Sequence, residues 1–302
     1  MSTRLYFRNA LFLPQDGRGR TSAAASSLLL LAIVTFGAFI TFGEYTMLSL
    51  PDAFGEEPSY AAFDTPRFIL YIGDNKRAGS NEKVDAAQVA KQSIAYLNTT
   101  HDELSRIFEQ KPSKKIVLRF LSPEEFRKQT GAPSWTSAMY FRDEITIPLS
   151  GSLGSNTEEL NRALRHEYVH AFIADFSSYR CPAWLDEGVA QLLEGPPNPL
   201  LGPALRQWIA QNPAIPLNWL QNGFTTLDND IVPAAYAESL FAARELIHLQ
   251  GFRAVTDYLH YLHEGKSEPR AFFLAFGTKE FQFEQELTLK IKHWSESPAE
   301  NP

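Results

Sequence analysis

Hydrophobic residues recur at two different spacings along the first half of the chain. Residues 67–73 (RFILYIG) and 114–121 (KKIVLRFL) are short apolar runs bounded by turn-forming or polar residues, which is typical of β-strands. Between them, residues 82–110 place apolar side chains every three to four positions and predict an amphipathic helix. Residues 138–149 (AMYFRDEITIPL) have two strand-like arms around a polar centre, which predicts a β-hairpin.

The second half of the chain follows a helical period almost throughout. Asn156 is predicted to cap a helix that runs to about Phe176, with Glu159 three positions later as its capping-box partner. Another helix is predicted to begin through Pro182, since proline is well suited to the first turn.

Strands followed by helices indicate the α+β class. We expect one domain over residues 67–295, with a small N-terminal sheet and a mostly helical C-terminal part. Loops are predicted at 195–203 and 221–233, and residues 296–302 are predicted to be a disordered tail.

Residues 23–43 (AAASSLLLLAIVTFGAFITFG) contain no charged side chain. These 21 positions would span about 30 Å as a helix, which matches the hydrocarbon core of a bilayer. Segment 1–22 is basic, and the first charges after the apolar run are acidic, so the positive-inside rule predicts a cytoplasmic N-terminus and an extracytoplasmic remainder, periplasmic or extracellular. A cleaved signal peptide, which would release the chain, and a buried core helix are the alternatives. Residues 44–66, with four prolines and glycines among scattered acids, are interpreted as a linker.

Charge and cysteine content narrow the classes of function. The net charge is −7, from 28 basic and 35 acidic residues, so the chain lacks the basic character of a nucleic-acid binder. Without residues 1–44 the net charge is −9, which does not favour anionic lipid surfaces or polyanionic substrates. The single cysteine, Cys181, excludes a disulfide within the chain and a multi-cysteine zinc site.

The candidate chemistry lies on one of the predicted helices. Residues 166–170 read His-Glu-Tyr-Val-His, an H-E-x-x-H motif. Positions i and i+4 share one helical face, so His166 and His170 can bind one Zn²⁺ ion. Glu167 projects from the next position and can act as general base on a water that the metal activates. The alternative is a helix with two surface histidines.

Residues 182–190 (PAWLDEGVA) follow this motif on the next predicted helix. A catalytic zinc ion needs a third protein ligand and one open position. The two motifs together resemble the gluzincins, H-E-x-x-H peptidases with a glutamate ligand on a following helix, and in particular their peptidase-MA-like branch, which carries a W-L-x-E-G-x-A segment. The resemblance implies a zincin-like fold, Glu187 as third zinc ligand, and Asp186 as acceptor of a hydrogen bond from a ligating histidine.

Other expectations follow from the same resemblance. Small residues at Gly188 and Ala190 would let their helix approach the His166 helix closely. Tyr236, at the start of a later helix, would face the zinc ion and stabilise the oxyanion, the alternative being a packed tyrosine. The hairpin at 138–149 would supply the edge strand along which zincins align extended peptides.

These residues predict a membrane-anchored zinc peptidase with a peptide or protein substrate, held in the lipid bilayer through residues 23–43. The alternative is a catalytically inactive zincin-fold module that binds or scaffolds at the membrane. Glu194 and Asp175 are interpreted as ordinary surface or capping carboxylates, and His260 and His263 as solvated helix positions. Substrate identity and oligomeric state stay open.

Overall fold

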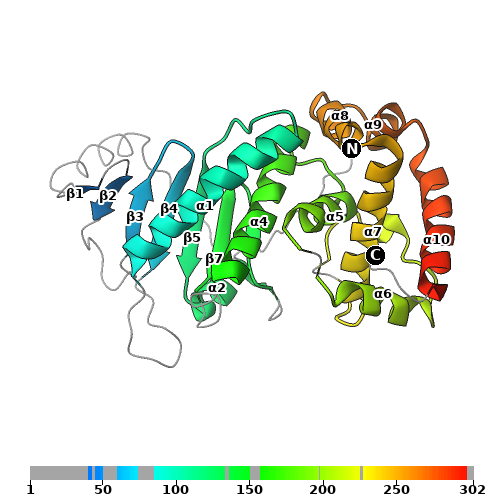
Figure 1. Ribbon diagram of the computed structural model, residues 1–302, viewed down its shortest axis with the longest axis horizontal. Coiled ribbons are helices and arrows are strands. Elements are labelled where there is room, and N and C mark those ends of the chain that lie inside the picture. Colours follow the sequence, from blue (N-terminus) through cyan, green and yellow to red (C-terminus); the bar gives the residue numbers. More distant parts are fainter. Residues whose placement is uncertain are drawn as a thin grey trace, which may run out of the picture.

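The computed structural model describes most of the chain as one sheet followed by a group of helices (Figure 1). The described residues are 40–42, 45–49, 60–73, 85–132, 136–149, 157–196, 198–224 and 227–297. One hydrophobic core runs through both parts, because buried side chains of the sheet and of the later helices form a single cluster. The α+β class predicted from the sequence is confirmed at this level.

The sheet is mixed and has the strand order β1-β2-β3-β4-β5-β7-β6. Strands β4, β5 and β7 run parallel to one another, and every other neighbouring pair is antiparallel. The parallel pairs require crossover connections, which helices α1 and α2 provide. The strands are β1 (Ile40–Phe42), β2 (Tyr45–Ser49), β3 (Tyr60–Asp64), β4 (Phe68–Gly73), β5 (Ile116–Leu121), β6 (Met139–Phe141) and β7 (Glu144–Pro148).

Strands β6 and β7 form the predicted hairpin. Its turn residues, Arg142 and Asp143, have φ angles of 48° and 66°, as a two-residue type I′ turn requires. Phe141 pairs with Glu144 directly across the turn. Strand β6 ends the described strand order, so the hairpin supplies an edge strand.

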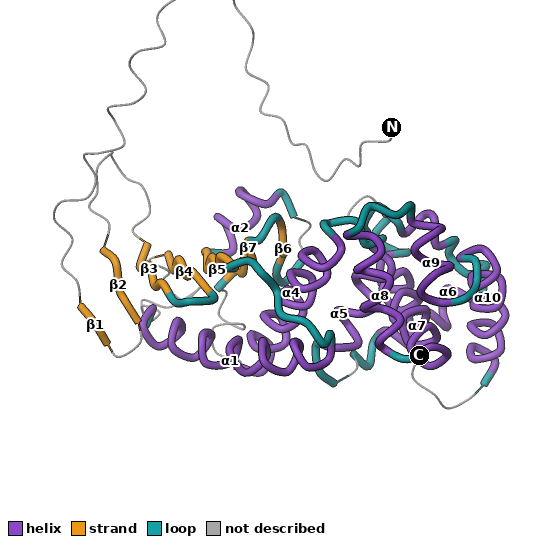
Figure 2. Tube along the Cα trace, turned by 90° about the horizontal axis from the view of Figure 1, so that it is seen from above, coloured by secondary structure: helices purple, strands orange, loops and turns teal. Residues whose placement is uncertain are grey.

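Helix α1 (Ala86–Ile107) lies along one face of the sheet, and the short helix α2 (Pro123–Thr130) lies on the other side (Figure 2). The side chain of Asp85 caps α1 by accepting hydrogen bonds from the backbone N–H groups of Ala87 and Gln88. Helix α4 (Thr157–Ser177) packs against α1 through aromatic contacts, such as that between His101 and Phe172 with ring centroids 5.7 Å apart.

The remaining helices lie on the far side of α4 from the sheet (Figures 1 and 2). They confirm the mostly helical second half, and Pro182 is the N-cap of α5 as the sequence predicts. These elements are α5 (Ala183–Leu193), α6 (Leu201–Ile209), the 3₁₀ turn η1 (Leu217–Leu220), α7 (Val232–Gln250), α8 (Phe252–His263), α9 (Glu268–Phe276) and α10 (Glu280–Glu296).

Gly188 permits a close helix contact, but with a different helix from the one predicted. A Cβ atom at this position would lie 2.2 Å from the Ser239 carbonyl oxygen and 2.8 Å from the Ala243 Cβ, both on α7. The prediction that Gly188 serves the approach to the His166 helix is therefore wrong. The face of α5 that carries Glu187 meets α4, and Gly188, one residue further around the helix, meets α7.

Segment 44–66 is not wholly the linker that its composition suggested. It contains β2 and β3, and β3 pairs with β4 over its whole length. Ala62 and Phe63 are 4% and 6% exposed, so this strand contributes to the core. Pairing with a neighbouring strand outweighed the turn-forming composition, because strand formation depends on partners far along the sequence.

Several predictions fall on residues outside the described ranges. The apolar segment 23–43 lies outside them except for Ile40–Phe42, which form β1. Asn156 and residues 298–302 also lie outside, and Glu296 is the last residue of α10 rather than part of a tail. Within the described ranges, no helix combines the length and the apolar character needed to cross a membrane.

Candidate metal centre

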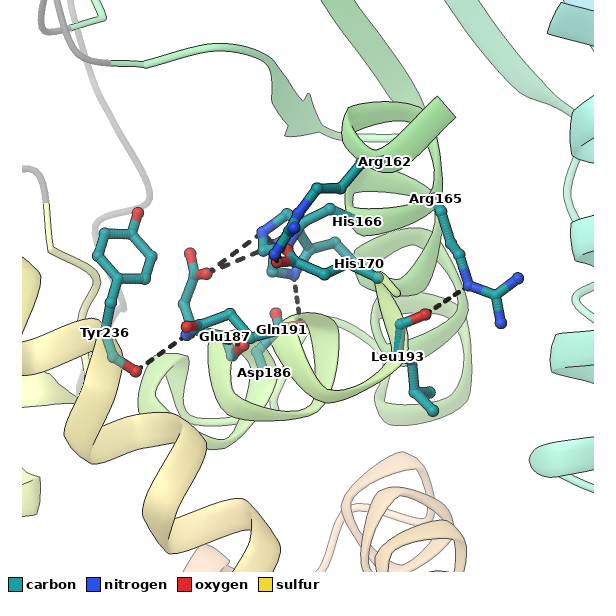
Figure 3. A network of polar contacts seen from close by, with 10 residues as sticks. Arg162, Arg165, His166, His170, Asp186, Glu187, Gln191, Leu193 and Tyr236 are labelled. Carbon is teal, nitrogen blue, oxygen red and sulfur yellow. Dashed lines mark hydrogen bonds and ion pairs between the residues drawn. The ribbon is translucent and has the colours of Figure 1, made fainter. Parts of the chain in front are cut away.

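The H-E-x-x-H motif lies in the middle of α4. Tyr168 and Val169, its two central residues, are 2% and 0% exposed and pack into the core. Because one side of the helix is held this way, His166 and His170 both point away from the sheet towards α5 (Figure 3). Their Nε2 atoms are 3.1 Å apart, and their ring planes cross at 80°.

Glu187 brings a carboxylate from α5 to the same point. Its Oε2 atom lies 3.5 Å from Nε2 of His166 and 3.8 Å from Nε2 of His170. In Figure 3 this carboxylate stands between the two imidazoles and Tyr236. The ligand atoms of the three residues lie within 4.8 Å of one another, so this group could hold a metal ion.

Two further carboxylates fix the orientation of the imidazoles. Nδ1 of His170 is 2.7 Å from Oδ1 of Asp186, and Nδ1 of His166 is 2.6 Å from Oε2 of Glu194. A carboxylate accepts, so each Nδ1 donates, and in the neutral form of each imidazole Nε2 keeps its lone pair. Both lone pairs then face the Glu187 carboxylate, as in sites where an outer carboxylate orients a metal-binding histidine.

The structure corrects the interpretation of Glu194 as an ordinary surface carboxylate. Its side chain is 11% exposed, and besides His166 it accepts a hydrogen bond of 2.9 Å from Nε of Arg162. The sequence did contain a signal for it, because position 194 is seven residues after Glu187 and hence on the same face of α5. Asp175 keeps its predicted character, since it accepts hydrogen bonds from Ser113.

The negative charges of the carboxylates around the two imidazoles favour a positive charge at this point. Burial alone would lower the pKa of His170, but the charges of Asp186 and Glu187 raise it to about 9. Burial likewise opposes protonation of His166, yet the neighbouring carboxylates of Glu187 and Glu194, together with the charge of Glu167, raise its pKa well above the ordinary value. The pKa of Glu187 is lowered despite burial, because both imidazoles stabilise its charged form.

Glu187 also provides a test of whether a metal ion fits. Its Oε2 atom is buried and makes no hydrogen bond among the described residues. A buried anionic oxygen without a donor is costly, and this one faces the Nε2 atoms of both imidazoles at 3.5 Å and 3.8 Å, so a metal ion bound among the three atoms would remove that cost. Two imidazole nitrogens and one carboxylate oxygen are a ligand set that Zn²⁺ prefers, with a fourth position open.

Glu167 lies between the imidazoles and the edge strand β6. It is 7% exposed, and burial raises the pKa of its carboxyl group, while the charges of His166 and His170 oppose the rise. The backbone of Tyr140 in β6 donates a hydrogen bond to it, which also favours the charged form. Glu167 is therefore a fixed carboxylate beside the metal ligands.

Tyr236 lies in the first turn of α7 and faces the same site. Nε2 of Gln191 donates to the carbonyl oxygens of Glu187 and Tyr236, at 3.3 Å and 3.0 Å, and so joins α5 to α7 here. Burial raises the pKa of Tyr236 well above the ordinary value, and the charges of Glu187 and Glu167 add to the rise. The phenol therefore stays protonated and can donate a hydrogen bond.

A cavity of about 760 Å³ opens beside these residues. Glu167, His166 and Tyr236 are among the residues that line it. The lining also includes residues 136–138, just before β6, and residues from the N-terminal half of α4, the end of α5, the segment before α6 and the start of α7. Of the three candidate ligands, His166 lines this cavity, so a molecule bound there would lie beside the candidate metal site.

The other histidines of interest stay outside the site. His260 pairs with Glu264 on the same helix at 3.1 Å, and His263 contacts Ser178 at 2.9 Å. Both histidines are exposed, in agreement with the predicted solvated helix. Cys181 is a buried cysteine, 4% exposed.

Comparison with known proteins finds little. No protein-family model matches the sequence, and no curated protein matches it. Among solved structures, the chain is similar to a mutant of a two-domain M1 zinc metallopeptidase bound to L-arginine, with a TM-score of 0.37 and 18% identity. The similarity covers 86% of this chain and 53% of that protein, so the chain spans about half of its length.

Proposed function

We propose that the chain is a gluzincin-type zinc peptidase that hydrolyses peptide bonds. The observation that carries the proposal is the convergence of His166, His170 and Glu187 with both Nδ1 atoms held by carboxylates. Glu167 and Tyr236 line the adjoining cavity and supply the two further groups that peptide hydrolysis needs, a proton acceptor and a hydrogen-bond donor.

In this proposal His166, His170 and Glu187 would hold the zinc ion. When bound, zinc supplies a Lewis acid that polarises a carbonyl group and makes a water molecule more acidic. Glu167 takes a proton from the attacking water and passes it to the leaving amine. Its burial raises its pKa, which makes it the better base, and the Tyr140 backbone N–H holds the carboxylate in place. The neutral Tyr236 phenol donates to the developing oxyanion.

The proposal includes a membrane anchor at residues 23–43, with the N-terminus in the cytoplasm. The support is in the sequence: an uncharged apolar run of membrane-spanning length, preceded by basic residues and followed by acidic ones. Membrane fractionation with carbonate extraction tests this part. Release of the intact chain by carbonate would exclude a spanning segment.

Metal analysis and a peptide-library digest of the full-length chain prepared with zinc test the chemistry. We expect one zinc ion per chain and cleavage that a chelator abolishes. Glu167→Gln should lower turnover roughly 10³-fold and leave the zinc content unchanged. Glu158→Gln is the matched control, because Glu158 is an exposed glutamate in the first turn of the same helix.

Each outcome of this experiment has a distinct meaning. Hydrolysis at the wild-type rate by Glu167→Gln would show that Glu167 is not the general base. One zinc ion without cleavage of any library member would favour the inactive binding module. A chain that stays metal-free in the presence of zinc would disprove the metal centre itself.

A further inference from the structure

Helix α4 ends in a backbone conformation that non-glycine residues rarely adopt. The N–H of Tyr179 donates to the carbonyl oxygen of Ala174 at 2.9 Å, a hydrogen bond that is typical of the Schellman motif at helix ends. Ser178 and Tyr179 have φ angles of 53° and 59°, in the left-handed region where a Cβ atom crowds the following carbonyl oxygen. The motif accounts for one left-handed residue directly after the helix, Ser178, but not for a second one at Tyr179. Such strain persists only where the surrounding structure holds the residue in place.

The side chain of Tyr179 contacts the turn of the β6–β7 hairpin. Its hydroxyl group donates a hydrogen bond to Oδ1 of Asp143, one of the two turn residues. Nζ of Lys114, which precedes β5, lies 2.8 Å from the Tyr179 hydroxyl oxygen and 3.1 Å from Oδ2 of Asp143. Burial would raise the pKa of Asp143, but hydrogen bonds from Tyr179 and Lys114 lower it, so the carboxylate stays charged. We call Lys114, Asp143 and Tyr179 the turn clamp.

Tyr140 connects the turn clamp to Glu167. Its hydroxyl group donates to Oδ1 of Asp143 at 3.1 Å. In the hairpin Tyr140 lies opposite Ile145, one pair away from the pair that flanks the two-residue turn. Because hydrogen-bonded and non-hydrogen-bonded pairs alternate in an antiparallel ladder, the backbone N–H of Tyr140 points away from β7 and off the edge of the sheet. There the Glu167 carboxylate of α4 accepts a hydrogen bond from it.

Tyr179 also lies on a firmly held part of the chain. It belongs to the short connection between α4 and α5, the two helices that carry the candidate metal ligands. The guanidinium of Arg180, the next residue, donates to the carbonyl oxygens of Leu262 and Lys266, at and just after the end of α8. The connection is thus fixed to α8 on one side and, through the turn clamp, to the hairpin on the other. The position of β6 relative to α4 therefore depends on the hydroxyl group of Tyr179.

We propose that Tyr179 is a positioning residue, which holds the Glu167 carboxylate in place through Asp143 and Tyr140. The inference rests on the proposed peptidase function, because Glu167 is the general base of that proposal. Tyr179 is not among the residues that line the described cavity, so it acts through the hairpin and not on the substrate. Glu167 lies on α4 and its donor lies on β6, so a shift of the hairpin changes the orientation of the carboxylate. A displacement of about 1 Å at a reacting group is enough to slow the chemical step.

Hydrogen exchange at the Tyr140 amide tests the positioning without requiring catalysis. Tyr179→Phe removes one hydroxyl group and keeps the ring. Exchange is followed on the full-length chain by mass spectrometry, with fragmentation to single residues. We expect the Tyr140 amide to exchange about fivefold faster in this variant, because the contribution of about one hydrogen bond to local stability is lost. The amide of Phe120, in the buried part of β5, should exchange at the wild-type rate.

Steady-state kinetics on a library peptide that the wild type cleaves provide the second measurement. Tyr179→Phe should lower kcat about fivefold and change KM less than about twofold, because the base is displaced and the cavity is not altered. Tyr140→Phe, which keeps the backbone N–H, should lower kcat by a similar factor. The two changes break the same chain of contacts, so the double variant should lose no more than about twofold beyond the larger single effect.

Tyr261→Phe is the matched control, because it removes the same hydroxyl group from a partly buried tyrosine beside a lysine. Nζ of Lys266 lies 4.9 Å from the centroid of the Tyr261 ring, and Nζ of Lys114 lies 4.6 Å from that of Tyr179. Tyr261 lies on α8 and does not line the described cavity. Both the exchange rate at Tyr140 and kcat should equal the wild-type values in this variant.

The results separate this inference from the proposed function. An unchanged exchange rate at Tyr140, an unchanged kcat, a rise in KM with kcat preserved, or multiplicative losses in the double variant would each overturn the inference. Faster exchange at Phe120 as well as at Tyr140 would show general destabilisation and would also overturn it, as would equal effects in Tyr261→Phe. Faster exchange at Tyr140 alone, in a chain that cleaves no peptide, would support the contact path from Tyr179 to Glu167 and refute the peptidase.

Discussion

The contact between α5 and α7 allows a prediction in which two known effects have opposite signs. Gly188 lies inside α5, and alanine is a better helix former than glycine by about 1 kcal/mol. If helix propensity decided the outcome, Gly188→Ala would raise the free energy of unfolding by that amount. The structure gives the opposite expectation, because the new methyl group would have no space.

The size of the opposing effect follows from the distances. The added Cβ would lie 2.2 Å from the Ser239 carbonyl oxygen, whereas ordinary contacts begin near 3.4 Å, so the helices must separate by about 1.2 Å. The obstacle is backbone within α7 and cannot rotate away. Overpacking a core typically costs 1–3 kcal/mol, and a backbone clash belongs at the upper end. After the gain in helix propensity, we expect a net loss of about 2 kcal/mol.

Equilibrium urea denaturation of wild type and Gly188→Ala measures the difference. A second variant, Gly188→Ala with Ala243→Gly, removes the side-chain contact at 2.8 Å and leaves the Ser239 carbonyl in place. It should therefore give little rescue, with an interaction energy below about 0.5 kcal/mol. A Gly188→Ala protein that is more stable than wild type would refute the close contact, and full rescue by Ala243→Gly would show that the side chain was the obstacle.

Two further predictions concern buried carboxylates. Glu194→Ala should weaken zinc affinity about 10- to 100-fold in a chelator competition, because His166 loses the hydrogen bond that orients its imidazole. Asp175→Ala, on the same helix as His166, should leave the zinc affinity unchanged. Burial raises the pKa of Glu238 to about 8, so the folded protein binds this proton more tightly than the unfolded chain. The resulting stability is fully present below about pH 4.5 and is lost as the pH rises through about 8, with a slope of at most about 1.4 kcal/mol per pH unit. Denaturation midpoints across this pH range should show the loss of stability. Glu238→Gln keeps an acceptor for the Ile215 N–H and should make the dependence of stability on pH shallower. An equal slope in that variant would contradict the assignment of this dependence to Glu238.

Local sequence patterns predicted those elements whose stability depends on nearby residues. The apolar period before Phe108, the proline at the start of α5 and the polar centre of the hairpin each indicated an element that the structure contains. The H-E-x-x-H spacing placed His166 and His170 on one helical face for the same reason. In all these cases the relevant neighbours lie within a few residues along the chain.

Features that depend on distant residues could not be predicted in this way. Strand β3 is stable because it pairs with β4 and buries Phe63. No pattern within residues 60–64 predicts this pairing. The role of Gly188 depended on which helix crosses α5 on that side. The spacing of Glu194 from Glu187 places both on one face of α5, but the contact of Glu194 with His166 depends on how α5 lies against α4.

The antiparallel contact between α4 and α5 explains why the carboxylates of the site occur at their positions. Arg162, near the start of α4, pairs with Glu194 at the end of α5. His170, one turn after His166, pairs with Asp186 at the start of α5. Glu187 and Glu194 are seven residues apart and share a face of α5. Glu187 therefore reaches the Nε2 atoms of both imidazoles, and Glu194 reaches Nδ1 of His166. Each imidazole is thereby held on its far side by a carboxylate outside the group of three candidate ligands. This arrangement, more than the three candidate ligands alone, turns both Nε2 atoms towards one point at which a single ion could bind.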